Sequence, residues 1–300
     1  MHPTSRFLDC DCIRLNNEAI ALLVTQNVGP RILALHLPGK ANLLAELPGV
    51  VIDHPGDRPF RFWGGHRLWY APEEKAITYL PDDQSVAITA VEGGLQMTPP
   101  AELGTGMQKT IIVTLPDETA TVIVDHTLTN GGSRPRLCAP WAITQLKPGG
   151  VAILPQNSAL NDPDGLQPNR SLALWPYTDI NSPYIQWGNR FVFVQAAMQK
   201  QDSPLKIGWA NPVGWMAYSW GEMLFVKQAV YQPSADYFDM GSSSQCYCRH
   251  DFIELETLGP RTLLEPGQSI SHREIWRVLS PVQLTKTEDA VAGMVKDWVY

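Results

Sequence analysis

Two glutamates, Glu254 and Glu256, stand two positions apart in the largely apolar stretch FIELETL (252–258). Alternate residues of a β-strand share a face, so both carboxyl groups would lie opposite Ile253 and Leu255, with their Cα atoms about 6.6 Å apart. On a solvent face they would be ordinary surface charges. In a cleft, mutual repulsion and partial burial would raise a carboxyl pKa, and one of them could act as a general base.

A second stretch, RFWGGHRLWYAPE (61–73), combines large rings with hydrogen-bond donors. Its candidate ligand-binding side chains are Trp63, Trp69, Arg61, His66 and Arg67. The rings could pack against the apolar face of a sugar, and the donors could bind hydroxyls or a carboxylate. Gly64 and Gly65 carry no side chains, so a ligand or another strand can approach closely. The alternative is a β-bulge packed by rings, in which Arg67 has a structural partner.

Strand geometry limits how this second stretch can build a site. In a regular strand His66 would share a face with Phe62 and Tyr70, whereas Arg67 would share the other face with Trp69. His66 and Arg67 would then point into one cavity only if the Gly pair breaks the alternation.

The cysteine and histidine pattern gives little support for a metal site. Cys246, Cys248 and His250 share one strand parity. Side chains at i and i+2 of a straight strand are too far apart to share a zinc ion at Zn–S distances of about 2.3 Å, unless the strand bends or Cys10 and Cys12 contribute. The sequence contains no nucleophile elbow, P-loop, H-E-x-x-H motif or dinucleotide fingerprint. We therefore expect no metal ion and no cofactor.

The composition is that of a globular protein that does not bind polyanions. Of its 300 residues 44% are hydrophobic, enough for a sizeable core, and the net charge of −7 disfavours nucleic acid and anionic membranes as partners. No run approaches the roughly 20 apolar residues of a membrane helix, and the N-terminus lacks the apolar segment of a signal peptide. Five cysteines fit reduced thiols. We expect a cytoplasmic protein with a small-molecule partner, and the sequence leaves its oligomeric state open.

Short apolar or alternating runs, separated by 25 Pro and 23 Gly, predict a protein made mainly of β-strands. The candidate strands are 19–25, 85–92, 109–115, 121–130, 190–198, 214–220, 223–230, 250–258 and 269–279. The runs 109–115 and 121–130 predict an antiparallel hairpin. Together the runs predict an all-β sandwich formed as a single domain over residues 1–300. The long polar loop 156–170 is of a kind that often forms part of a site.

One helix is predicted at the end of the chain, over about residues 286–299. Thr285 or Thr287 can cap its N-terminus, where acidic residues follow. Four apolar residues then fall on one helical face, and they are Val291, Met294, Val295 and Trp298. The helix should therefore pack on the sandwich.

Four segments occur in a familiar order along the chain. They are NVGPRILALHLPGKANLLAE (27–46), FWGGHRLWYAPE (62–73), TLTNGGSRPRLCAPWAITQLKPGG (127–150) and FIELETLGPRTLLEPGQSISHREIW (252–276). Together they resemble the galactose mutarotase-like superfamily, which includes the aldose 1-epimerases, over roughly residues 19–280. The resemblance implies a large, mostly antiparallel β-sandwich whose sugar site lies on a concave sheet face.

The resemblance also implies roles for individual residues. In aldose 1-epimerases a glutamate in an L-E-T-like context takes the proton of the anomeric hydroxyl, and a histidine protonates the ring oxygen. The matching base is Glu256, which leaves Glu254 as a flanking ligand or a surface group. The family histidine follows the central strand, but the corresponding CAPWAITQL (138–146) contains Trp141 and no histidine. His66, in a GGH that resembles a family HGG, is the implied acid.

These features predict a sugar-active isomerase that interconverts the anomers of an aldose or a modified sugar by acid/base ring opening. The predicted catalytic residues are Glu256 and His66, and the predicted substrate-binding residues are Arg61, Trp63, Arg67, Trp69, Trp141 and Glu254. An acidic or phosphorylated sugar would be consistent with Arg67, Arg61 and Arg31, because guanidinium groups bind anions bidentately.

Two other functions remain open at the level of the sequence. A carbohydrate-binding protein without turnover is the first alternative, because the usual acid histidine is missing and losing a general acid costs a factor of about 10²–10⁴ in rate. A polysaccharide lyase or hydrolase is the second, since sandwiches of this shape also serve such enzymes.

Overall fold

The computed structural model describes residues 4–54 and 58–299, and in these residues the strands form two large antiparallel sheets and one small one. The first sheet has eleven strands: β1 (Thr4–Phe7), β2 (Cys10–Asn16), β3 (Ala21–Thr25), β4 (Arg31–His36), β7 (His66–Ala71), β12 (Arg136–Leu146), β21 (Ile253–Leu258), β20 (Ser244–Cys248), β17 (Leu205–Trp209) and β14 (Leu172–Leu174) in spatial order, with β22 (Thr262–Leu264) paired to β12.

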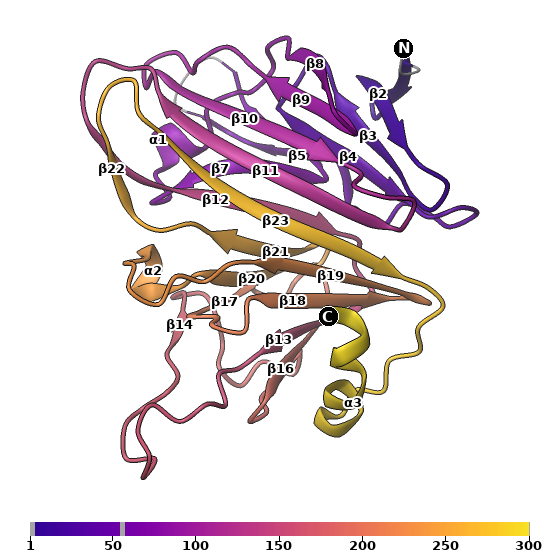
Figure 1. The fold of residues 1–300 in the computed structure, drawn as a ribbon, viewed down its shortest axis with the longest axis vertical. Coiled ribbons are helices and arrows are strands. Elements are labelled where there is room, and N and C mark those ends of the chain that lie inside the picture. Colours follow the sequence, from indigo (N-terminus) through magenta and orange to yellow (C-terminus); the bar gives the residue numbers. More distant parts are fainter. Residues whose placement is uncertain (1–3, 55–57, 300) are drawn as a thin grey trace.

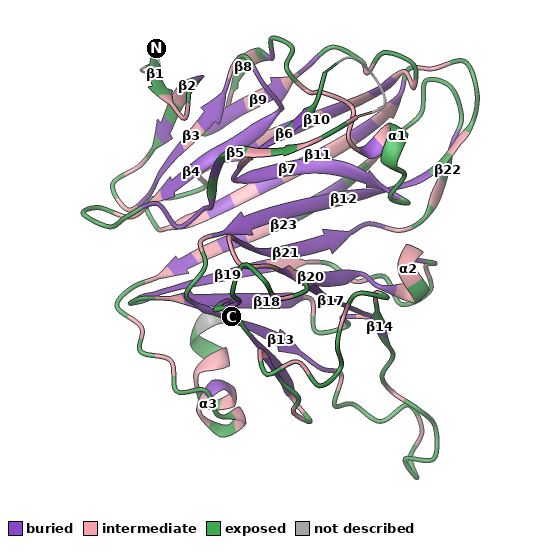
Figure 2. Cartoon of the chain, turned by 180° about the vertical axis from the view of Figure 1, so that it is seen from behind, coloured by how far each residue is buried: buried purple, intermediate pink, exposed green. Residues whose placement is uncertain are grey.

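The second sheet has ten strands within the same described residues. In spatial order they are β15 (Ile185–Gln186), β16 (Phe191–Gln195), β13 (Val151–Pro155), β18 (Trp215–Trp220), β19 (Met223–Ala229), β23 (Ser269–Leu279), β11 (Thr121–Asn130), β10 (Met107–Thr114), β9 (Gly94–Thr98) and β8 (Ala87–Val91). β11 and β23 are nearer the viewer in Figure 1, and β7 and β12 are nearer in Figure 2, which is turned by 180°. The two sheets are therefore layers of a sandwich, as the sequence predicts.

The main hydrophobic core lies between these two layers. Every second residue of β10 and of β11 is buried, because one face of each strand contributes to the core. These two strands form the predicted hairpin, with Met107 opposite Asn130. Ile253 and Leu255 of β21 face the same core, which confirms the predicted parity of that strand.

The outer face of the eleven-stranded sheet is also covered, mainly by a small sheet made of β5 (Glu46–Ile52) and β6 (Phe60–Gly64). Phe60 and Phe62 of β6 pack with Trp69 and Trp141 in a second apolar cluster. Figure 2 shows this small sheet in front of β7, which is buried along its whole length. The central strands thus have two buried faces, and a cavity can form on the outer one.

The Gly pair ends one strand and begins another. Gly64 and Gly65 have φ angles of 93° and 72°. A Cβ atom would lie 1.9 Å from the carbonyl oxygen of Ala45 at position 64 and 2.1 Å from that of Ile32 at position 65. Only glycine fits this close approach of three chain segments. The stretch predicted as one strand or bulge is therefore β6 and β7, in two different sheets.

Three helices complete the described chain: α1 (Lys75–Thr78), α2 (Phe238–Gly241) and α3 (Glu288–Val299). The α3 helix confirms the predicted C-terminal helix, and the hydroxyl of Thr287 accepts a hydrogen bond from the backbone N–H of Ala290 at 3.4 Å. Val291, Met294 and Val295 pack in an apolar cluster with β13 and β18, whereas the side chain of Trp298 lies outside the described residues. No described helix is long and apolar enough to span a membrane.

Candidate functional site

A cavity of about 260 Å³ opens on the outer face of the eleven-stranded sheet, and we call it the outer-face cavity. It is lined by Ile52, Phe62, Arg67, Trp69, Glu73, Tyr79, Trp141, Trp175, Tyr177, Pro204, Lys206, Tyr247, Arg249, Phe252 and Glu254. Four predicted substrate-binding residues are among them: Arg67, Trp69, Trp141 and Glu254. Strands far apart in the sequence (β7, β12, β17, β20 and β21) contribute side chains to it, because antiparallel pairing places them side by side.

Glu254 is the carboxyl group of β21 that reaches the cavity. Its Oε1 accepts hydrogen bonds from Arg67 Nη2 at 3.1 Å and from Gln145 Nε2 at 2.8 Å, and no described residue donates to its Oε2. Burial raises the pKa of the Glu254 carboxyl to about 7, although the adjacent positive charge of Arg67 opposes that shift. Glu254 can therefore take up or release a proton near neutral pH.

Glu256 is held behind the cavity wall. Its Oε2 accepts hydrogen bonds from Trp141 Nε1 at 2.6 Å and from Lys206 Nζ at 2.9 Å. The residue is fully buried and is not among those that line the cavity, whereas 6% of Glu254 is exposed. The carboxylate matched to the family base is thus covered by the indole and the ammonium group that bind it.

Aromatic rings form much of the cavity wall. Lys206 Nζ lies 4.7 Å from the ring centroid of Trp141 and 4.8 Å from that of Trp175, so the ammonium is held between two indoles. The guanidinium carbon of Arg67 lies 4.2 Å from the ring centroid of Trp69. Rings beside hydrogen-bonding groups in a concave site suit a ligand with both an apolar face and hydroxyls.

The charges that line the cavity are paired within the described residues. Arg67 pairs with Glu254, and Lys206 pairs with Glu256. Arg249 pairs with Asp251, with 2.6 Å between Arg249 Nε and an Asp251 oxygen. The outer-face cavity therefore contains ionic groups that can form hydrogen bonds. Each of the three cations among its described lining residues already has a carboxylate partner, so none is unpaired for an anionic ligand.

His66 does not share a cavity with Glu256, so the structure does not bring the predicted acid and base together. The ring of His66 is fully buried between the two large sheets, where it packs edge-on against Trp276 at 4.7 Å between centroids. The Gly pair does break the alternation, since Phe62 lies beside Arg67 rather than beside His66. Within β7, however, His66 and Arg67 still point to opposite faces.

Hydrogen bonds fix the protons of the buried histidines. His126 Nδ1 lies 2.9 Å from the carbonyl oxygen of His272, so it must carry the proton and leave Nε2 as an acceptor. His66 Nε2, 2.7 Å away, then donates to His126, and His66 Nδ1 accepts from the hydroxyl of Thr144 at 2.9 Å. Burial holds the pKa of His66 well below its usual range, and the positive charges of Lys227 and Arg67 nearby lower it further. His66 is a neutral core residue with both nitrogens satisfied.

Three further residues of the predicted site lie outside the outer-face cavity. Trp63 packs against the cluster formed by Cys10, Cys12, Val28 and Leu33, and Arg61 and Trp63 line a separate surface hollow beside it. Arg31 is buried, and its guanidinium donates to Asp82 at 2.6 Å and to backbone carbonyls of β6. An anion-binding role shared by Arg67, Arg61 and Arg31 is therefore wrong for this cavity.

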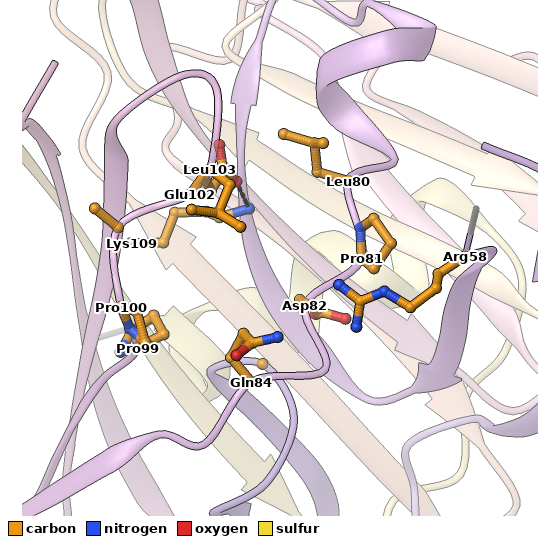
Figure 3. Close-up of a pocket in the computed structure, with 12 residues that line it drawn as sticks. Arg58, Leu80, Pro81, Asp82, Gln84, Pro99, Pro100, Glu102, Leu103 and Lys109 are labelled. Atoms are coloured by element: carbon orange, nitrogen blue, oxygen red, sulfur yellow. Dashed lines mark ion pairs between the residues drawn. The ribbon is translucent and has the colours of Figure 1, made fainter. Parts of the chain in front are cut away.

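A second cavity, of about 210 Å³, lies beside the segments 80–84 and 99–103 (Figure 3). Its walls contain Leu80, Pro81, Pro99 and Pro100, and its Lys109 pairs with Glu102. The aromatic rings and the two-glutamate strand of the outer-face cavity are absent from the residues that line it. We therefore assign the candidate functional site to the outer-face cavity.

Several residues of the outer-face cavity were not identified from the sequence. Trp175, Tyr177 and Tyr247 lie in segments whose sequences do not differ from those of other strands and loops that contain aromatic residues. Lys206 could have been identified from the sequence. It stands between Leu205 and Ile207 in LKIGW, and a charged residue inside an apolar strand is rare unless it is paired. Gln145, which donates to Glu254 without lining the cavity, is a polar residue inside the apolar run AITQL in the same way.

The sequence matches no family model and no curated protein. Solved structures do match. A candidate aldose 1-epimerase from Klebsiella pneumoniae aligns at a TM-score of 0.61 and 10% identity, covering 96% of this chain and 83% of the other. A galactose mutarotase-like protein from Lactobacillus casei aligns at a TM-score of 0.53 and 11% identity, covering 89% and 100% of the two chains. A galactose mutarotase related enzyme from Lactobacillus acidophilus aligns at 0.51 and 7%, covering 92% and 100%.

The chain has the galactose mutarotase-like fold. At these identities the likeness establishes the arrangement of strands alone, and the sequence resemblance predicted that arrangement. In this galactose mutarotase-like fold the outer-face cavity lies over the central strands β7, β12 and β21 of the larger sheet.

Proposed function

We propose that the protein binds a neutral aldose in the outer-face cavity and interconverts its anomers by acid/base ring opening, with a glutamate of β21 as the base. The observation that carries the proposal is Glu254, whose largely buried carboxyl, with a pKa of about 7, lines an aromatic cavity. Opening a sugar ring requires a group that accepts the anomeric proton near neutral pH, and such a carboxyl meets that requirement.

A neutral sugar fits the electrostatics of the cavity better than an anionic one. The three cations among the described lining residues each have a carboxylate partner. A phosphate or carboxylate on the ligand would have to compete with those partners for the cations. Displacing a partner would leave its carboxylate buried without a cation, which is strongly unfavourable. Neutral hydroxyls can donate to carboxylates and accept from cations without separating the pairs.

Binding without turnover is the second candidate, and one observation favours it. Glu256, which matches the family base, is covered and bound by Trp141 and Lys206. If no other group replaces it, the cavity would hold a sugar without opening its ring.

The test adds the protein to freshly dissolved pure anomers of neutral, acidic and phosphorylated sugars and follows the approach to anomeric equilibrium by NMR. We expect acceleration with a neutral aldose. Trp69→Ala should weaken sugar affinity at least tenfold, whereas the matched variant Trp63→Ala, outside the cavity, should retain it. Binding without acceleration would establish the second candidate, and neither binding nor acceleration with any sugar would exclude both.

A further inference from the structure

We infer that Glu254 and Lys206 form the proton-transfer pair of the outer-face cavity, with Glu254 as the base and Lys206 as the acid. This inference rests on the proposed function and assigns its catalytic residues. It gives the base role to the other glutamate of β21, and it supplies the acid that the missing histidine near Trp141 leaves unassigned.

The first observation concerns which oxygen atoms a ligand can reach. Glu254 lines the cavity, and its Oε2 has no donor among the described residues. Both of its hydrogen bonds end on Oε1, so Arg67 and Gln145 fix the carboxyl group while one oxygen stays available. Glu256 also has both donors on one oxygen, Oε2, but its Oε1 is buried without a partner in the described part of the chain and the whole side chain is covered, so no oxygen of Glu256 is available to a ligand.

The second observation concerns Lys206. Its ammonium uses one N–H on Glu256 at 2.9 Å and is held between the rings of Trp141 and Trp175. An ammonium has three donors, so two remain for a ligand in the cavity that Lys206 lines. The Glu256 carboxylate accepts from this ammonium and holds it at the cavity wall, which makes Glu256 the positioning residue for the acid.

The spacing of Glu254 and Lys206 suits one sugar ring. Lys206 pairs with Tyr247 across β17 and β20, and Tyr247 pairs with Glu254 across β20 and β21. Two strand spacings separate the Cα atoms of Lys206 and Glu254, about 10 Å. Both side chains are on the same face, with Tyr247 between them in the cavity wall. A pyranose lying over Tyr247 could contact Glu254 at one edge and Lys206 at the other.

The proton transfers balance without any further reactant. Glu254 takes the proton of the anomeric hydroxyl, the bond between C1 and the ring oxygen breaks, and C1 becomes an aldehyde carbon. The ring oxygen receives a proton from the Lys206 ammonium and becomes a hydroxyl. After rotation about the C1–C2 bond, that hydroxyl adds to C1 and returns its proton to the lysine amine, and Glu254 returns a proton to the anomeric oxygen.

The test compares anomer exchange rates, measured by NMR saturation transfer, for the unmodified protein and for Glu254→Gln, Lys206→Met and Glu256→Gln. We expect Glu254→Gln and Lys206→Met to lose a factor of about 10²–10⁴ in rate, as for loss of a general base or acid, with sugar affinity within a few-fold. Glu256→Gln should retain more activity than either, because an amide oxygen can still accept from Lys206. Glu102→Gln, in the second cavity, is the control for loss of a partly buried carboxylate that pairs with a lysine.

The pH profile of the unmodified protein is a second measurement that needs no variant to fold. The rate should rise with pH through about 7, as Glu254 ionises, and a rate that does not change with pH around 7 would contradict Glu254 as the base. Full activity in Glu254→Gln, or loss of activity only in Glu256→Gln, would overturn this inference while the proposed function stands. An unmodified protein that accelerates no sugar would overturn both.

Discussion

His66 and Arg67 are neighbours in β7, and their side chains lie on opposite faces of the eleven-stranded sheet. His66 faces the ten-stranded sheet and bonds to His126, while Arg67 faces the outer-face cavity and bonds to Glu254. This one-residue change of face separates the groups that stabilise the sandwich from the groups that can meet a ligand.

Replacing His66 should affect stability rather than activity. His66→Leu removes the donor to His126 and the acceptor for Thr144, so two buried polar groups lose a partner. We expect the free energy of unfolding to fall by about 2–4 kcal/mol, with sugar affinity and anomer exchange per folded molecule nearly unchanged. Denaturant unfolding and saturation transfer measure the two quantities. A hundredfold loss of rate at unchanged stability would instead restore His66 as the acid.

The buried histidines should make the sandwich less stable in acid. The pKa values of His66 and His126 are lowered by burial, and burial lowers that of His272 to about 3. Below pH 6.5 the unfolded chain therefore binds more protons at these sites than the folded protein does, up to about three as the pH falls. Glu254 acts in the opposite direction, because its raised pKa lets the folded protein bind one more proton below about pH 7.

The net difference of at most about two protons predicts that the free energy of unfolding falls by up to about 2.7 kcal/mol per pH unit between pH 6 and 5. Glu274, the carboxylate next to the buried Lys227, has a lowered pKa and adds to the loss only below about pH 4.5. Denaturant unfolding at pH 7, 6 and 5 measures the slope. Stability that is flat or rises on acidification would contradict this description of the histidine cluster.

Arg67 should set the pKa of Glu254. Arg67→Met keeps the packing against Trp69 but removes the positive charge, so the carboxylate loses its main electrostatic support. We expect the pKa of Glu254 to rise by about one unit or more, and we expect Arg67→Lys to keep it near 7. A ¹³C NMR titration of the glutamate carboxyl groups reports this pKa without any assay of activity. Identical titrations in the two variants would show that Arg67 does not act on Glu254.

Gly65 should be nearly irreplaceable for a steric reason. A Cβ at position 65 would lie 2.1 Å from the carbonyl oxygen of Ile32, whereas at Gly39, which has a similar positive φ, it would meet nothing within 4 Å. Gly39→Ala should therefore cost only about 1–2 kcal/mol of unfolding free energy, the cost of the left-handed backbone. Gly65→Ala should cost clearly more, or prevent folding. Equal costs would mean that the junction of β6 and β7 can relax.

Much of the fold could be predicted because it follows from local patterns. The alternation in β10, β11 and β21 and the capped apolar face of α3 each depend on residues close in the sequence. The parity argument also placed Glu254 and Glu256 on one face, and Arg67 on the face of Trp69. These are statements about a single strand, where side-chain direction is set by the backbone.

The candidate site was harder to predict because it depends on which strands become neighbours. Nothing local indicates that β17 lies two strands from β21, so Lys206 was missed although it binds Glu256. His66 was predicted in the site because it stands among rings and donors and matches a family motif, whereas in the structure its side chain follows the strand parity into the core. Trp63 was grouped with Trp69 because the sequence does not show that the Gly pair separates two sheets.

A crystal structure of the protein with a neutral aldose tests the central claim most directly. We predict a sugar ring in the outer-face cavity, with its apolar face against Trp69 or Trp141 and a hydroxyl within hydrogen-bond distance of Glu254 Oε2. A sugar bound instead in the second cavity of Figure 3, or an outer-face cavity that stays empty at saturating sugar, would contradict the account.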